Sequence, residues 1–252
     1  MSAIITLDQL KETTPSVFAT EPSGKVSDRY SFVPTFELLE KFMDEGWVIS
    51  SGNQMGKGLH GRHQIRLRNG ELPQVGDTLV EAVINNSHNG TSLFSVSAGL
   101  HRLVCSNGLT VPTSISEAFK LRHTSIDGSE VRKFTEEFAG RLPMIEASVD
   151  KMMNKSVSEV EKTSFVKSAA GIRWKMGQMP TGLTLEQVLE PLREGDKGND
   201  MWSLFNVVQE KFVRGGLKYK TNKRSTSMKE LRSINSLQKV NSELWELADS
   251  YC

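Results

Sequence analysis

The sequence predicts an α+β protein, with an antiparallel β-meander or hairpin core in the first half and a mainly helical second half. Polar and apolar residues alternate in short segments before residue 128. Two Asn-Gly pairs, Asn89-Gly90 and Asn107-Gly108, offer the tight turns that hairpins use. After Gly128 the apolar residues recur every three or four positions, which is the helical period. Strands followed by helices are typical of this fold class.

Three parts are expected along the chain. Residues 1–33 contain several proline and glycine breakers and are predicted to be loosely structured. Residues 34–128 form a β-rich domain, which opens with a helix that begins near Pro34. Residues 129–252 form a helical region, and a basic segment at 211–239 lies within it.

Within the β-rich domain, a strand is expected to start at Trp47, and the glycine-rich stretch Gly52–Gly61 predicts a flexible loop after it. The sequence HQIRLR alternates, so that Arg66 and Arg68 share one face of the next strand. Further strands are predicted at 78–85, 91–105 and 119–124.

In the second half, the apolar spacing predicts a long helix from Ser129 and another from Ser156 to about Met176. Further helices are predicted over TLEQVLEPL after Gly182, over GNDMWSLFNVVQEKF before Gly215-Gly216, and from about Ser227 to the C-terminal region.

Composition narrows the class of protein. The chain has 252 residues, a net charge of +1 and only two cysteines, Cys105 and Cys252. A disulfide framework is therefore not expected, and this suits a protein of the reducing cytosol. The first residues do not show a basic region followed by an apolar run, and no apolar stretch reaches the roughly 18 residues that a membrane span needs. We therefore expect a cytoplasmic protein that does not enter a membrane.

The charge is unevenly distributed. The segment Lys211–Lys239 contains nine Lys or Arg residues and one acid, Glu230, and two aromatic residues, Phe212 and Tyr219, lie among the cations. Clustered cations bind the phosphates of nucleic acids, and exposed rings stack on the bases of single strands. The alternative is a solvated loop that offsets the acidic remainder. The predicted nucleic-acid contacts are Arg66, Arg68, Lys211, Arg214, Lys218, Tyr219, Lys220, Lys223 and Arg224.

Other candidate sites are less specific. A phosphate-binding loop has four residues between its glycines and a Ser or Thr after its Lys. Here only three residues separate Gly52 from Gly56, and a glycine follows Lys57. All five histidines lie between His60 and His123, but neither CxxC nor HExxH occurs. Cys105 at a strand end is typical of a small buried residue. We therefore assign no catalytic residue, no metal ligand and no cofactor.

Several motifs resemble one protein family. SHNGT, GLHRLVCSNGL and LRHTSIDG occur in the family's order, after DRYSFVPTFELLEKFMDEGW and before GNDMWSLFNVVQEKFVRGG. Together they resemble the family called domain of unknown function 932 over about residues 28–250, with Asn89 where that family usually has Asp. The resemblance implies a phage, prophage or plasmid protein in the host cytoplasm, and DNA metabolism or conflict with host defence. It supplies no catalytic residues.

These observations lead to three hypotheses. The first is a mobile-element DNA-binding protein that anneals or recombines single strands as a homo-oligomer, and a meander followed by a long helix is similar to the lambda Beta and RecT-like annealing proteins. Such an analogy of fold does not determine function. The second hypothesis is an interaction protein that inhibits a host defence enzyme, and the third is a metal-dependent nuclease that uses the histidine-rich half.

Overall fold

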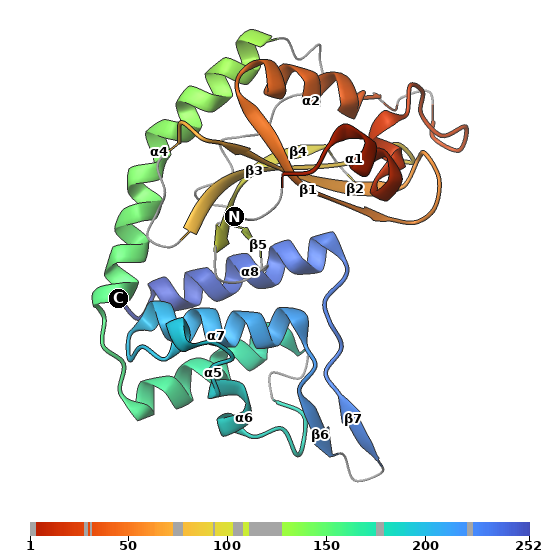
Figure 1. The fold of residues 1–252 in the computed structure, drawn as a ribbon. Helices are drawn as coiled ribbons and strands as arrows, with labels where there is room; N and C mark the ends of the chain where they lie inside the picture. The colour runs from red at the N-terminus through yellow and green to blue at the C-terminus, as the bar shows by residue number, and fades with distance from the viewer. Residues whose placement is uncertain are drawn as a thin grey trace. The chain divides into compact units, whose positions relative to one another are not determined.

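The first half of the chain folds around one antiparallel sheet, whose five strands lie in sequence order in this computed structural model (Figure 1). The structure describes residues 4–27, 30, 32–72, 78–92, 94–102, 108–110, 128–174, 179–220 and 224–252. The strands are β1 (Trp47–Met55), β2 (Arg62–Asn69), β3 (Thr78–Ser87), β4 (Ser95–Arg102) and β5 (Gly108–Thr110). The predicted meander and the α+β class are thus confirmed.

Local chemistry accounts for the turn between β3 and β4. Gly90 has a φ of +72°, which glycine adopts without the clash that a Cβ would cause. The Asn89 carboxamide oxygen accepts a hydrogen bond from the Thr91 amide at 3.1 Å. Asn89-Gly90 therefore lies in a turn, as predicted. The connection is longer than the expected tight hairpin, because the pairing of β3 with β4 ends at Asn85 and Ser95. The second turn, at Asn107, and the strand predicted at 119–124 lie outside the described residues.

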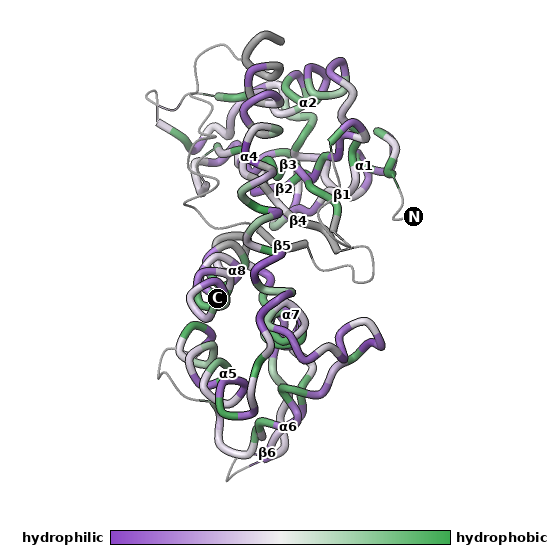
Figure 2. The backbone as a smooth tube through the Cα atoms, turned by 90° about the vertical axis from the view of Figure 1, so that its left-hand side faces the viewer, coloured by the Kyte–Doolittle hydropathy of each residue, from purple (hydrophilic) through white to green (hydrophobic). Residues whose placement is uncertain are grey.

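Three short helical segments pack against β1 and β2: α1 (Leu7–Thr13), η1 (Pro15–Phe18) and α2 (Thr35–Asp44). The prediction of a loosely structured N-terminus is wrong for α1 and η1. Thr6 and Gln9 form a reciprocal capping box that starts α1, and Leu10 is fully buried. Hydrophobic and hydrophilic residues alternate along α2, as Figure 2 shows, and its buried side chains include Leu39 and Phe42.

The glycine-rich stretch between β1 and β2 is more ordered than the sequence suggested. Gly52 lies inside β1, where it pairs with Ile65, and the turn is confined to residues 56–61. A Cβ at Gly52 would overlap the side chains of Leu10 and Thr14. Glycine is needed here because α1 lies so close to the strand.

The chain divides into two compact units, Met1–Pro143 and Met144–Cys252. The division falls at Pro143, inside α4 (Gly128–Asn154), and thus after the predicted domain boundary at 128. Helical periodicity begins at residue 128, whereas a domain boundary depends on which residues pack together, so the two need not coincide. No helix in the described part of the chain is both long and apolar enough to cross a membrane.

The second unit is helical and has one central helix. Its elements are the end of α4, α5 (Glu159–Arg173), α6 (Leu185–Leu189), η3 (Glu194–Asp196), α7 (Met201–Arg214), β6 (Lys218–Lys220), β7 (Ser225–Ser227) and α8 (Ile234–Asp249). α7 packs against α5, α6, η3 and α8, and its residues from Met201 to Val213 are all buried. The rings of Trp202, Phe205 and Trp245 contact one another at the centre of this core.

One predicted helix starts later than expected. The last helix begins at Ile234 rather than near Ser227, because Ser225–Ser227 forms β7 and pairs with β6. Neither strand was predicted. Each has only three residues, which is too few for an alternating pattern to stand out.

Candidate nucleic-acid interface

The two strands β6 and β7 form an antiparallel ribbon whose two faces differ in chemistry. Lys218 pairs with Ser227, and Lys220 pairs with Ser225. Successive side chains of a strand point to opposite faces, so these two lysines and two serines share one face, and all four are exposed. Tyr219 pairs with Thr226 on the opposite face, where both are half-buried.

The base of the ribbon is attached to the helices by backbone contacts. Gly215 ends α7 with a φ of +72°, and a Cβ at this position would overlap the carbonyl oxygen of Met228. The Gly216 amide donates to that same Met228 oxygen at 2.8 Å, and the Met228 amide donates to the Leu217 oxygen at 2.8 Å. These contacts close the ribbon at the point where it leaves the helical core.

Two side chains add to this attachment. Arg173, at the end of α5, donates from Nε to the Phe212 oxygen at 2.9 Å and from Nη2 to the Lys229 oxygen at 2.8 Å. Gln187 of α6 donates from Nε2 to the Lys218 oxygen at 3.0 Å. Burial lowers the pKa of Arg173, and the nearby Tyr219 hydroxyl acts in the opposite direction. Tyr219 therefore lies near Arg173, on the ribbon face opposite to the two lysines. Figure 1 shows the ribbon projecting from the helices of this unit.

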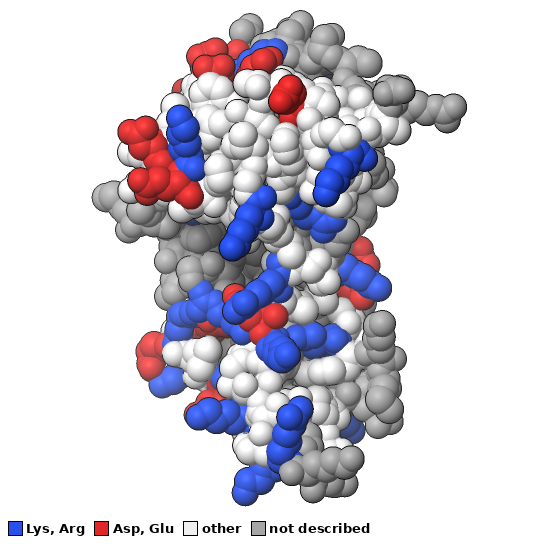
Figure 3. Space-filling model, turned by 90° about the vertical axis from the view of Figure 1, so that its right-hand side faces the viewer, with Lys and Arg blue, Asp and Glu red and all other residues white. Residues whose placement is uncertain are grey.

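The remaining predicted cations of this unit differ in their surroundings. Lys211 is 5% exposed within α7, which leaves little of it for a phosphate, and Phe212 is fully buried. Arg214 forms an ion pair with the buried Glu210 at 3.1 Å. Arg224 is exposed and has an interaction of its own, and Lys223 lies outside the described residues. In the view of Figure 3, Lys and Arg side chains outnumber acidic ones over this unit.

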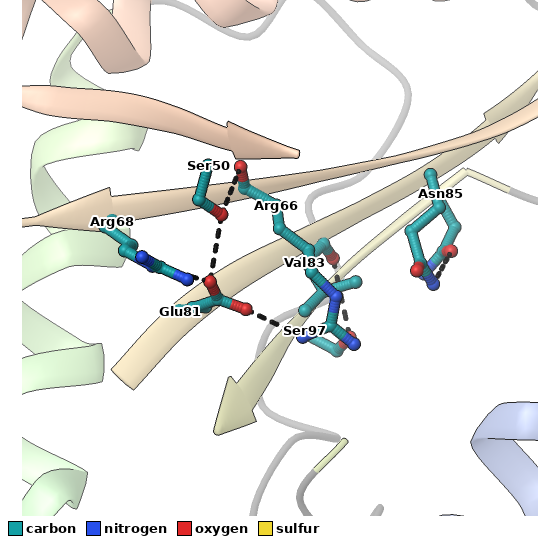
Figure 4. A network of polar contacts seen from close by, with 8 residues as sticks. Ser50, Arg66, Arg68, Glu81, Val83, Asn85 and Ser97 are labelled. Atoms are coloured by element: carbon teal, nitrogen blue, oxygen red, sulfur yellow. Dashed lines mark hydrogen bonds and ion pairs between the residues drawn. The ribbon is translucent and has the colours of Figure 1, made fainter. Parts of the chain in front are cut away.

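The two predicted arginines of the first unit converge on one carboxylate (Figure 4). Arg66 Nη1 lies 2.8 Å from Glu81 Oε2, and Arg68 Nε lies 2.7 Å from Glu81 Oε1. Ser50 donates to Glu81 Oε1 at 2.9 Å, and Glu81 itself has no exposed surface. The prediction that the arginines share one face of β2 is confirmed. Their charges are shared with a buried acid, and their side chains are only 12% and 13% exposed.

A buried polar cluster occupies the other face of the same sheet. His63 lies between two hydroxyl groups, with Ser16 Oγ 2.8 Å from Nδ1 and Thr35 Oγ1 2.9 Å from Nε2. The Gly61 carbonyl oxygen lies 3.1 Å from Nδ1 and can only accept, so the ring proton lies on Nδ1. Nε2 therefore accepts from the Thr35 hydroxyl, whose oxygen accepts from the Asn86 amide at 2.9 Å. Burial lowers the pKa of His63 to about 4, and the neighbouring His88 adds to this effect.

His88 is the least satisfied member of this cluster. It is fully buried, and neither of its ring nitrogens has a hydrogen-bond partner among the described residues. Its ring lies 5.1 Å from that of His63 and 4.8 Å from that of Phe32. Burial lowers the pKa of His88 to about 4, the backbone of Ser16 acts in the opposite direction, and the nearby His60 adds to the lowering. Both histidines are therefore neutral at pH 7.

No site for the metal-dependent nuclease hypothesis lies among the described residues. Among the described residues, no group of three or more His, Cys, Asp or Glu side chains is placed to hold a metal ion. Cys105 and His123 lie outside those residues. Arg173 and Gln187 were not among the predicted nucleic-acid contacts, and the short strands that they support were not predicted.

Comparison with known proteins identifies the family. Residues 22–245 match the protein family described as Domain of unknown function (DUF932). The chain belongs to this family. It is also 30% identical to UPF0380 protein YafZ of Escherichia coli (strain K12) and 29% identical to UPF0380 protein YfjQ of the same strain, over 98% of this chain and 91% of each relative. No solved structure matches. The resemblance seen in the motifs is thus confirmed, and neither the family description nor the relatives' names assign an activity.

Proposed function

We propose that this protein binds DNA through the cationic face of the β6–β7 ribbon and holds it without a catalytic step. The observation that carries the proposal is the pair Lys218 and Lys220. Both are exposed on one face, neither has an ion pair within the described part of the chain, and no acidic residue occurs from Lys211 to Lys229. A phosphate backbone is the partner that such a face attracts most strongly.

The setting that we propose rests on the resemblance of the motifs, which implies a phage- or plasmid-borne protein. In that setting the protein would act in the host cytoplasm, on the DNA of the mobile element or of the host. One ribbon offers few phosphate contacts, so we expect several copies to bind together as a homo-oligomer. Strand annealing, the use expected from the sequence, requires rings that stack on bases beside the cations. Phe212 is buried and Tyr219 faces away from the lysines, so annealing remains an alternative that the test below includes.

Fluorescence anisotropy with labelled duplex and single-stranded DNA across a salt series tests the proposal. Binding is expected at low salt and should weaken steeply as salt is added. The variant Lys218→Ala/Lys220→Ala should bind more weakly and lower the slope of log K against log salt by about 1.8, because each phosphate contact with B-DNA contributes about 0.9.

A matched control removes the same charge elsewhere. Lys151 and Lys167 are exposed helical lysines of the same unit, so Lys151→Ala/Lys167→Ala changes the net charge equally and should leave the slope unchanged. Equal losses in the two variants would mean that only net charge matters. Absence of binding to either DNA at low salt would refute the proposal, and a pull-down from host lysate would then test the anti-defence alternative.

A further inference from the structure

We infer that the DNA bound by the ribbon is a B-form duplex, and that β6 and β7 enter its major groove with the Lys218, Lys220, Ser225 and Ser227 face toward the base edges. The inference rests on the proposed function and adds the substrate class and the binding mode. It starts from the alternation of side chains along β6, which places Lys218 and Lys220 on one face and the ring of Tyr219 on the other.

The composition of the exposed face favours base edges over stacking. Each lysine stands opposite a serine, so the face presents ammonium donors beside hydroxyl groups that donate and accept. In the major groove, lysine donates to guanine O6 and N7, and serine bonds to either kind of edge group. An interface for single strands needs aromatic platforms on the same surface as its cations. This face has none, because Tyr219 and Thr226 are the ribbon residues that point the other way.

The other rings near the ribbon are already engaged. Trp174 follows α5, its ring meets Phe212 edge to face at a centroid distance of 5.1 Å, and the Arg173 guanidinium carbon lies 5.8 Å from the centre of its ring. Tyr219 is half-buried on the ribbon face opposite to the lysines, and it lies near enough to Arg173 to affect the pKa of that residue. Arg173 lies over the Trp174 ring and also supports the ribbon base through two backbone carbonyls, so a base that stacked on that face of Trp174 would compete with this arginine.

The size and support of the ribbon fit a groove. Paired strands lie about 4.8 Å apart, and the B-DNA major groove, about 12 Å wide, admits a two-stranded ribbon. The major groove of A-form RNA is too narrow for side chains to read. The ribbon is held at its base by Gly215, Arg173 and Gln187, and Gly182 lies against the backbone of Lys220 at the other end of β6. The ribbon carries no acid that would repel phosphates. A preorganised ribbon loses less conformational freedom on binding than a loop does.

Competition against a labelled DNA duplex tests the inference on the unmodified protein. The competitors are the same duplex, either of its single strands, and the corresponding RNA duplex. We expect the single strands and the RNA duplex to compete on the order of tenfold less well, which is the discrimination that a few base-edge contacts provide. Methylation of guanine N7 in the major groove should inhibit binding, whereas the minor-groove ligand distamycin should not.

Two variants separate the two faces of the ribbon. Ser225→Ala/Ser227→Ala removes hydroxyl groups but no charge, so the affinity for duplex should fall several-fold while the salt slope stays constant. Tyr219→Leu removes the ring of the opposite face and should leave duplex affinity unchanged.

Single strands that compete as well as the duplex, or a larger loss from Tyr219→Leu than from the serine variant, would overturn the inference and favour annealing. Absence of inhibition by N7 methylation would also overturn it, and this result does not depend on the folding of a variant. Failure of every nucleic acid to bind would instead reject the proposed function itself.

Discussion

The paired histidines of the first unit predict that this unit loses stability in mild acid. Folding lowers the pKa of both His63 and His88 from 6.5 to about 4, chiefly through burial. Between those two values the unfolded chain binds more protons than the folded one, so stability falls as the pH falls. The full stability is present above pH 6.5 and is lost progressively toward pH 4.

The size of the effect follows from the linkage relation. Each histidine that gains a proton only on unfolding makes stability change by about 1.4 kcal/mol per pH unit, and the whole window corresponds to roughly 3 kcal/mol for each. The rings of His63 and His88 lie 5.1 Å apart, so a proton on one opposes a proton on the other in the folded state. We therefore expect a slope of between about 1.4 and about 2.8 kcal/mol per pH unit from pH 6.5 to 5, above the range in which most carboxylates titrate.

Pulse proteolysis in urea measures this slope for each unit, because the fragments identify which unit has unfolded. The second unit contains no histidine, so its midpoint should stay constant over the same range and serves as the internal control. His88→Phe keeps an aromatic ring against Phe32 and removes two unpartnered buried nitrogens. It should raise stability at pH 7 by about 1 kcal/mol and lower the slope to that of one histidine. A wild-type midpoint that does not change from pH 6.5 to 5, or a His88→Phe slope equal to the wild-type slope, would show that these histidines are not buried as neutral groups.

Three further predictions concern the other contacts. Glu81→Gln removes the carboxylate that pairs with two largely buried arginines and should destabilise the first unit by about 3 kcal/mol in urea denaturation. A loss below about 1 kcal/mol would contradict the buried ion-pair network. Gly215→Ala and Gly216→Ala both place a side chain at positive φ, but only the former overlaps neighbouring backbone, so it should cost about 1–3 kcal/mol more in thermal or urea unfolding of the second unit. Equal losses would refute the close approach at Gly215. Arg173→Lys keeps the charge but cannot reach two carbonyls, so DNA affinity should fall several-fold at constant salt slope, and an unchanged affinity would remove its positioning role.

The sequence was most informative where the pattern was local. The alternation in β2 correctly predicted that Arg66 and Arg68 share a face, and the Asn-Gly pair predicted the turn between β3 and β4. It could not reveal that both arginines meet Glu81, because that contact depends on the pairing of β2 with β3. Cations that look equivalent in a sequence can differ in how much of their charge remains available.

The basic segment shows the same limit more clearly. Lys211 and Lys218 both count as cations in the sequence, but thirteen of the fourteen residues of α7 are buried. The elements that surround the helix cause this burial, and its own sequence pattern does not show it. α7 carries charged residues at positions that a surface helix would expose, and only its contacts with four other elements show that it is central. The part of the predicted site that the proposal retains is therefore the β6–β7 ribbon that follows α7.

The alternation of side chains along β6 determines which form of DNA the ribbon suits. In a loop, a Lys-Tyr-Lys sequence lets the ring lie beside its neighbouring cations, and that arrangement suits single-stranded DNA. In β6 the same three residues must alternate, so the lysines lie together on one face and Tyr219 lies on the other. One short strand thus changes which form of DNA the segment suits, from a strand whose bases stack on rings to a duplex whose groove accepts a polar ribbon. Because both forms carry the same phosphates, salt dependence alone does not distinguish them, and the decision belongs to the competition between duplex and single strand.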